Sequence, residues 1–203
     1  MSTIITSSNG FKLRLATLAD KDTIIQAYDN FPQPLVQTYQ DALDKFSLGH
    51  YLNKGYNETA VKDNNAPLGR MEVLENSDEV IVSISILNYN RLAPKSYEAS
   101  WTVVPVEHRG NKYNTAHLMV SGYYNFTVLD MDYVYWDLIQ TDTQINNVDT
   151  HWKSKNGAVS TAEIAKTGVG TGASLKTQRI LAAEYEAVRA AHSTWKSVTY
   201  TTS

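Results

Sequence analysis

An apolar run that leads into an arginine, a glycine and a helical pattern is the feature of this sequence best suited to chemistry. Residues 103–114 read VVPVEHRGNKYN, and apolar residues recur at helical spacing from Ala116 onward. Backbone N–H groups at a helix N-terminus have no intrahelical partner and lie at the positive end of the helix dipole, so they can bind a phosphate group. Arg109 can add a charge-assisted hydrogen bond to the same anion. The plainer alternative is that Arg109 and Gly110 are ordinary turn residues.

The elements that must position this loop can be predicted from hydrophobic periodicity and turn residues. Strands are predicted at residues 11–15, 59–62, 70–74, 80–87, 97–104, 133–139 and 158–166. Helices are predicted from Asp20 to before Pro32, and at residues 36–46, 116–128, 142–155 and 175–192, with Gly49 near the end of the second. This order predicts an α/β protein of the α+β type, with a mixed, mostly antiparallel central sheet flanked by helices.

The loop and its surroundings resemble the GNAT N-acetyltransferase superfamily. Members have a V-x-P-x-x-R-G-x-G-x-G type pattern between a strand and a helix, which Val103 or Val104, Pro105, Arg109 and Gly110 match. A second family motif falls in step with residues 146–157, and FKLRLATLADKDTI at residues 11–24 resembles the first strand and helix of the family. The resemblance covers residues 11–158.

This resemblance implies a reaction, a cosubstrate and a set of site residues. It implies transfer of an acetyl group from acetyl-CoA to an amine acceptor, with the helix N-terminus binding the pyrophosphate. The residues it assigns to acetyl-CoA are Val104, Arg109, Gly110, Lys112, Asn114 and Asn146. It assigns Glu98 as the general base, although a carboxylate at a strand edge can also be merely solvated. Lys153 stands where many members have a tyrosine that protonates the departing thiolate, and Tyr123, Tyr124 or Trp152 are alternatives.

The departures from the family pattern support a second hypothesis from another class. Lys112 and Asn114 replace glycines that let the loop approach a phosphate closely, and Lys153 replaces the tyrosine. The chain could therefore be a catalytically degenerate GNAT-fold structural or interaction protein, including a phage virion component. Whether it is an enzyme stays open at this point.

Composition and charge exclude several other classes. The chain has 203 residues, 18 basic and 21 acidic side chains and no basic cluster, which argues against a nucleic-acid partner. It has no cysteine, and its five histidines never fall at metal-ligand spacing, so we expect no metal. No apolar run is long enough to span a membrane. We expect a cytoplasmic protein, or a virion protein under the second hypothesis.

The sequence of the C-terminal part predicts how the chain divides into a domain, a linker and a final helix. Residues 1–167 would form the GNAT-like domain, residues 168–174 a Gly-rich linker, and residues 175–203 an additional helix with a polar tail. The glycines at 168–172 lack the order of a phosphate-binding P-loop. The apolar stripe of the last helix could pack on its own sheet or on a partner subunit, in a homo-oligomer or a larger assembly.

Overall fold

The computed structural model describes residues 3–30, 38–64, 68–91, 93–139, 159–164 and 175–202. Its strands are β1 (Thr3–Ser7), β2 (Lys12–Leu15), β3 (Leu68–Glu75), β4 (Ile81–Tyr89), β5 (Ser96–Val103), β6 (Tyr133–Ile139), β7 (Val159–Ile164), β8 (Leu175–Leu181) and β9 (Tyr200–Thr202). Its helices are α1 (Lys21–Asp29), α2 (Tyr39–Gly55), α3 (Glu58–Lys62), α4 (Tyr113–Tyr123) and α6 (Ala182–Ala191). A π-helical turn, Tyr124–Val128, extends α4.

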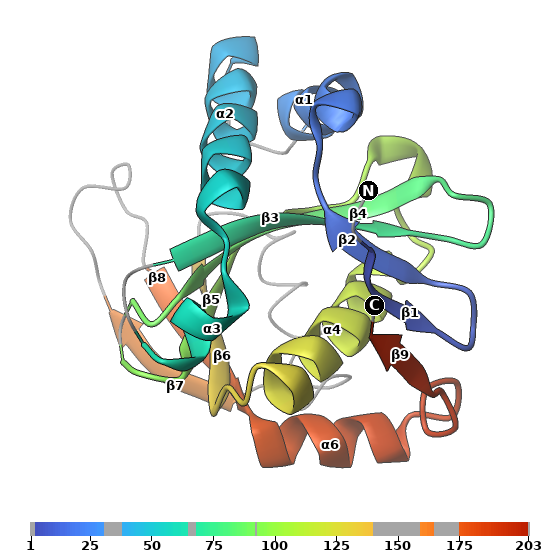
Figure 1. The fold of residues 1–203 in the computed structure, drawn as a ribbon, viewed down its shortest axis with the longest axis vertical. Coiled ribbons are helices and arrows are strands. Elements are labelled where there is room, and N and C mark those ends of the chain that lie inside the picture. The colour runs from blue at the N-terminus through green and yellow to red at the C-terminus, as the bar shows by residue number, and fades with distance from the viewer. Residues whose placement is uncertain are drawn as a thin grey trace.

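The nine strands that the described residues form make one sheet in the order β7-β8-β6-β5-β4-β3-β2-β1-β9. Only β5 and β6 are parallel, and every other neighbouring pair is antiparallel. Helices α1 and α2 lie on one side of the sheet, and α4 and α6 lie on the other (Figure 1). The predicted fold class, a mostly antiparallel sheet with helices on its faces and a helix near the C-terminus, is therefore confirmed.

Two apolar cores follow from the alternation of side chains along the central strands. Met71 and Val73 of β3 face α1 and α2, where they pack with Phe46 of α2. Leu74 of β3 faces the other side, in the core that includes Met119 of α4. Each face of the sheet is thus covered by its own pair of helices.

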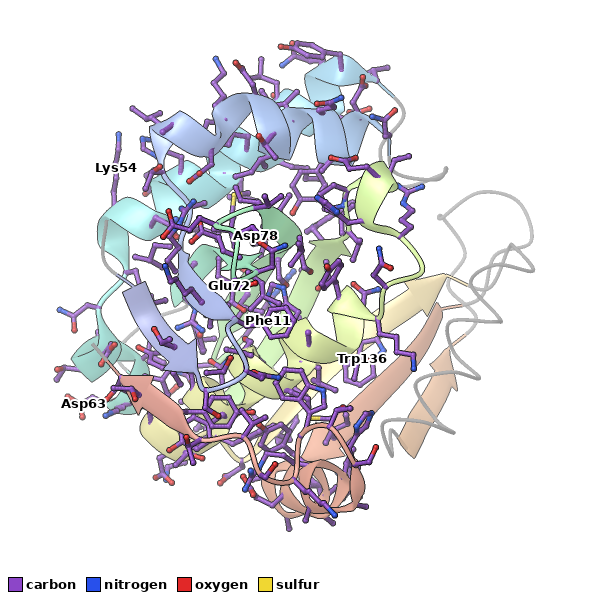
Figure 2. All side chains as sticks on the ribbon, turned by 90° about the vertical axis from the view of Figure 1, so that its right-hand side faces the viewer. Phe11, Lys54, Asp63, Glu72, Asp78 and Trp136 are labelled. Atoms are coloured by element: carbon purple, nitrogen blue, oxygen red, sulfur yellow. The ribbon has the colours of Figure 1, made fainter. Side chains whose placement is uncertain are left out.

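The second core contains a buried network of charged and hydroxyl side chains. Arg70 and Glu72 of β3 are both fully buried, and Arg70 Nε donates to Glu72 Oε2 at 2.8 Å. From α4, His117 Nε2 lies 2.8 Å from Glu72 Oε1, and Ser121 Oγ donates to the same oxygen at 2.5 Å. Figure 2 shows Glu72 inside the molecule. The network fastens α4 to β3.

Charge explains why the carboxyl group of this network stays ionised. Burial alone would raise the pKa of Glu72, but the positive charge of Arg70 and the hydrogen bonds from His117 and Ser121 outweigh burial and lower it to about 2. The guanidinium of Arg70 also lies 4.5 Å from the ring centroid of Tyr124, and its Nη1 donates to Tyr56 Oη at 2.9 Å. The positive charge is therefore compensated as well.

Several predicted elements differ from the structure. Residues 59–62 were expected as a strand but belong to α3, because Asn57 Oδ1 accepts a hydrogen bond from the Ala60 amide and caps a helix there. The second helix covers Tyr39–Gly55 instead of residues 36–46, and Gly49 lies inside it against Met71. The helix predicted at residues 142–155 lies outside the described residues.

The C-terminal part differs most from the expectation. The helix predicted at residues 175–192 begins only at Ala182, because Leu175–Leu181 forms β8 between β6 and β7. The polar tail contributes β9, which pairs with β1. The chain after residue 174 therefore supplies two strands of the sheet as well as a helix. The proposed linker at residues 168–174 lies outside the described part of the chain.

Docking of α6 depends on one glycine of α4. A Cβ atom on Gly122 would lie 2.6 Å from Cε2 of Tyr185, whose hydroxyl donates to the Met119 carbonyl at 2.6 Å. We expect Gly122→Ala to lower the free energy of unfolding by about 1–3 kcal/mol because it overpacks this contact. Denaturant unfolding measures the change. Gly55→Ala is the matched control, because no atom lies within 4 Å of its Cβ position. Equal stability of the two variants would contradict this account.

Candidate functional site

The two parallel strands at the centre of the sheet separate part of the way along their length. Their ladder has three pairs, Ser96 with Tyr133, Tyr97 with Val134 and Glu98 with Tyr135. Beyond these, β6 continues to Ile139 in pairing with β8, and β5 continues to Val103 in pairing with β4. No further pair joins β5 to β6 among the described residues. The edge of β5 beyond Glu98 therefore has no ladder partner on this side within the described part of the chain and can accept a ligand that carries hydrogen-bonding groups.

A backbone irregularity lies in β5 just after the strands separate. Trp101 has φ of 53°, in the left-handed region, and the register with β4 shifts between the pairs Ile86 with Ser100 and Ile84 with Val103. Tyr28 Oη donates to the Trp101 carbonyl at 2.7 Å, and Lys45 Nζ lies 3.7 Å from the centroid of its ring. These contacts fix a conformation that is costly for a bulky residue. Sequence reasoning missed Trp101, because nothing in the periodicity marks a bulge.

The loop between β5 and α4 contains two residues with left-handed backbone. Gly110 has φ of 84° and open space where a Cβ would lie, so backbone can approach a ligand there. Lys112 has φ of 63° and is the N-cap of α4. Left-handed backbone at this position explains why the family pattern has a glycine there. The lysine keeps that conformation, at a cost of about 1–2 kcal/mol.

The N-terminus of α4 has backbone donors at the end of this loop that no carbonyl of the helix itself accepts. The Ala116 amide makes the first intrahelical bond of α4, to the Lys112 carbonyl at 3.1 Å. The amide hydrogens of Tyr113, Asn114 and Thr115 therefore have no intrahelical acceptor. The side-chain oxygen of Asn114 is buried and has no hydrogen-bond partner among the described residues. These groups fit an extended ligand that carries both phosphate oxygens and hydrogen-bond donors.

Arg109 has a more specific position than the sequence predicts. Its Nε donates to the Val104 carbonyl at 3.3 Å, and its Nη2 donates to the Asn30 carbonyl at 2.9 Å. Arg109 thereby joins the end of β5 to the end of α1. The side chain is exposed, and a guanidinium has five N–H donors, so donors remain for an anion. Its contact with a phosphate stays a prediction.

Glu98 lies at the last rung of the parallel ladder, where β5 and β6 separate. Its side chain is 16% exposed, and its Oε2 accepts hydrogen bonds from Arg91 Nη1 at 3.1 Å and from Asn88 Nδ2 at 3.4 Å. Tyr97 on the same strand belongs to the core beneath α4, so by alternation Glu98 faces the side of α1 and α2. Its neighbours Arg91 and Asn88 carried no signal in the sequence.

The remaining predicted site residues lie either outside the described part of the chain or away from the loop between β5 and α4. Lys153 and Asn146, like the alternative acid Trp152, lie outside the described residues. Tyr123 and Tyr124 are at the C-terminal end of α4, about 16 Å along the helix from Lys112. Tyr123 stacks on Tyr200 at 4.2 Å, and Tyr124 is buried in the Arg70 network. Neither tyrosine lies at the loop between β5 and α4.

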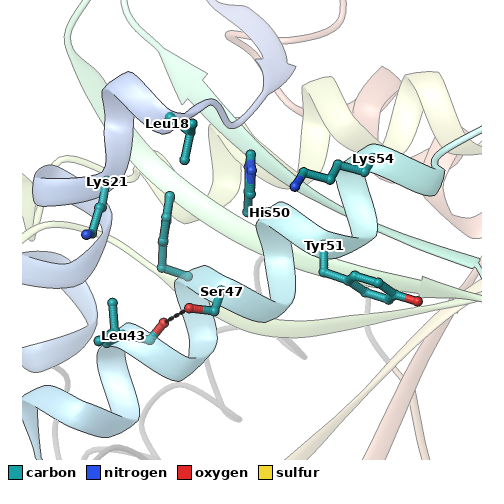
Figure 3. Close-up of a pocket in the computed structure, with 8 residues that line it drawn as sticks. Leu18, Lys21, Leu43, Ser47, His50, Tyr51 and Lys54 are labelled. Atoms are coloured by element: carbon teal, nitrogen blue, oxygen red, sulfur yellow. Dashed lines mark hydrogen bonds between the residues drawn. The ribbon is translucent and has the colours of Figure 1, made fainter.

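A hollow of about 310 Å³ on the surface of α1 and α2 is a separate feature (Figure 3). It lies between the start of α1 and the outer face of α2, and is lined by Leu18, Lys21, Phe46, His50 and Lys54 among others. None of its lining residues belongs to β5, α4 or the loop between them. It is therefore no part of the site around Glu98 and Arg109.

Within the described residues, no group of three or more His, Asp or Glu side chains could hold a metal ion. The expectation that the protein needs no metal stays a prediction. No described helix combines the length and the apolar character needed to cross a bilayer.

Comparison with known proteins gives the fold a functional context. No family model and no curated protein matches the sequence. A spermidine N-acetyltransferase from Vibrio cholerae, solved in complex with CoA and spermine, superposes with a TM-score of 0.62 at 19% identity, covering 87% of this chain and 98% of that chain. A chimera of the Vibrio cholerae enzyme and hSSAT has a TM-score of 0.65 at 17% identity, covering 87% and 98%.

A third structure is the Vibrio cholerae spermidine/spermine N-acetyltransferase in complex with manganese ions, with a TM-score of 0.59 at 16% identity over 87% of this chain and 95% of that chain. All three structures are acetyltransferases, and they give no support to a phage or virion component. With the separated strands and the sheet order, these likenesses establish that the chain has the fold of the GNAT N-acetyltransferases.

Proposed function

We propose that the protein is an N-acetyltransferase that transfers an acetyl group from acetyl-CoA to an amine. The observation that carries this proposal is the separation of β5 from β6 at Glu98, followed by a loop that ends in N-terminal amides of α4 with no acceptor within the helix. A ligand with a pyrophosphate at one end and amide groups along its arm is complementary to these two features. Acetyl-CoA has this chemistry.

The residues that would hold acetyl-CoA follow from the geometry of the loop. The pyrophosphate would accept hydrogen bonds from the amides of α4, with Arg109 and Lys112 adding positive charge. The amides of the pantetheine arm would pair with the edge of β5 that has no ladder partner among the described residues, near Val104. The orphan oxygen of Asn114 would accept a donor from the same ligand.

The reaction would take place beside Glu98, at the point where β5 and β6 separate. The acceptor must lose a proton to become nucleophilic, and Glu98, directly or through a water, would remove it. The amine nitrogen then forms a bond to the thioester carbonyl carbon, and the carbon–sulfur bond breaks. The nitrogen loses a second proton as the amide forms, and the CoA thiolate gains one to leave as the thiol, so the proton that Glu98 removed is released to solvent. We propose Lys153 as the donor of the proton to the thiolate and Asn146 as a further contact to acetyl-CoA.

Replacement of Arg109 tests the binding site. We expect Arg109→Ala to raise the Kd for acetyl-CoA about 10–100-fold, because a hydrogen bond to a charged group contributes about 1.5–3 kcal/mol. Isothermal titration calorimetry measures this Kd. Arg189→Ala on α6 is the matched control, because Arg189 pairs with Glu186 on its own helix.

Two results of this titration would argue against the proposal. An unchanged Kd in Arg109→Ala would show that Arg109 only joins the loop to Asn30. If the unaltered protein bound no acetyl-CoA at all, the alternative of a catalytically degenerate structural or interaction protein would be favoured.

A further inference from the structure

The strand edge proposed to receive the acceptor amine carries an ion pair. Arg91 Nη1 and Glu98 Oε2 are 3.1 Å apart, and the Arg91 side chain is 66% exposed while that of Glu98 is 16% exposed. The carboxylate is therefore held within the fold, and the guanidinium presents most of its donors to solvent. A positive and a negative group thus lie side by side at the same place.

A second cation lies on the same face of the sheet. Lys45 of α2 is held over the ring of Trp101, three residues beyond Glu98 on β5. Both Lys45 and Trp101 are only partly buried. Glu98 already shares its carboxylate with Arg91 and with the amide of Asn88. A polycationic acceptor would meet two fixed positive charges and a carboxylate that is already paired.

A zwitterionic acceptor is complementary to this arrangement. In an α-amino acid the ammonium and the carboxylate are separated by one carbon, so both can reach the partners of an ion pair whose atoms are 3.1 Å apart. The ammonium would bind Glu98, and the carboxylate would take two parallel hydrogen bonds from the planar guanidinium of Arg91. Each charge then has an opposite charge as its neighbour.

We infer that the acceptor is a small α-amino acid, bound by its amine to Glu98 and by its carboxylate to Arg91. This inference rests on the proposed N-acetyltransferase activity and specifies its acceptor. The products are the N-acetyl amino acid and CoA: the carbon–nitrogen bond forms and the carbon–sulfur bond of the thioester breaks. The ammonium nitrogen loses two protons, one through Glu98 to solvent before attack, and one as the amide forms, which balances the proton gained by the CoA thiolate. Arg91 acts as a specificity-determining residue.

Matched pairs of acceptors provide the test. Lysine and ornithine are compared with their decarboxylated counterparts 1,5-diaminopentane and 1,4-diaminobutane, and with spermidine, by release of the CoA thiol. We expect kcat/KM to be about 10–100-fold higher for each amino acid than for its diamine, the ratio that a charge-assisted hydrogen bond of about 1.5–3 kcal/mol gives. The carboxylate is the only difference within each pair.

Variants of Arg91 then test the role of the guanidinium. Arg91→Ala should raise KM for the amino acids and remove the preference, without a change in the Kd for acetyl-CoA. Arg91→Glu should reverse the preference in favour of the diamines. Lys95→Ala is the control, because Lys95 lies in the same β4–β5 connection but pairs with Asp130 at 2.5 Å. It should keep the preference of the unaltered protein.

The outcomes separate failure of this inference from failure of the proposed function. Acetylation of spermidine or diamines in preference to amino acids, unaffected by Arg91→Ala, would overturn the inference and leave an acetyltransferase. Binding of acetyl-CoA without acetylation of any amino acid would also overturn it. Absence of acetyl-CoA binding by calorimetry would overturn both.

Discussion

Replacement of Glu98 by glutamine is expected to lower kcat for acetyl transfer about 10²–10⁴-fold, the contribution typical of a general base. Glutamine keeps the size of the side chain and can still accept hydrogen bonds from Arg91 and Asn88, but it cannot take a proton from the acceptor. The Kd for acetyl-CoA should not change, because the pyrophosphate would bind at the loop and at α4. Steady-state kinetics and calorimetry measure the two quantities separately.

A second carboxylate serves as the control for this experiment. Glu79 is exposed in the β3–β4 turn and pairs with Lys12 at 2.7 Å, so Glu79→Gln should leave kcat unchanged. If Glu98→Gln turned over at the rate of the unaltered protein, Glu98 would be a partner of Arg91 alone and another group would be the base. If it lost acetyl-CoA binding, the substitution would have disturbed β5 itself.

Breaking the buried Arg70–Glu72 pair should cause a large loss of stability. We expect Arg70→Met to lower the free energy of unfolding by about 3–5 kcal/mol, because it leaves the carboxylate of Glu72 buried without its compensating guanidinium. Methionine fills a similar volume, so a cavity is not the main cause. Denaturant unfolding followed by circular dichroism measures the change.

A double substitution distinguishes charge from packing. Arg70→Met combined with Glu72→Gln removes both charges and keeps an acceptor for His117 and Ser121, so it should be more stable than Arg70→Met alone. Lys12→Met breaks an exposed pair and should leave stability almost unchanged. Additive losses from the two buried substitutions would show that the charges act independently, contrary to the network in the structure.

Local sequence patterns predicted the strands and helices whose conformation is set by residues close to them in the chain. The strand at residues 133–139 was predicted with its observed bounds, Tyr133–Ile139, because it is rich in β-branched and aromatic residues and bounded by polar turns. The first helix was predicted because a polar N-terminus precedes an apolar stripe. Elements whose formation depends on a distant partner were missed: β1 and β9 pair with each other across almost the whole chain.

The helix predicted from residue 175 shows why periodicity was insufficient. Residues 175–181 lie between β6 and β7, and this pairing decides their conformation although their pattern is compatible with a helix. Similarly, Arg70 and Glu72 look like exposed polar positions of a half-buried strand. In the folded protein α4 packs over them. The hydrogen bonds from His117 and Ser121 then offset the free-energy cost of burying the Glu72 carboxylate.

The sequence by itself determined the fold class and located the loop around Arg109 and Gly110, because a strand, a turn and a helix start are encoded by neighbouring residues. Tertiary structure decided where β5 and β6 separate, that Arg109 reaches Asn30, and that Arg91 meets Glu98. These contacts join residues that are distant in the chain or on different elements. Their geometry is set by how the sheet and helices pack, which no local pattern records.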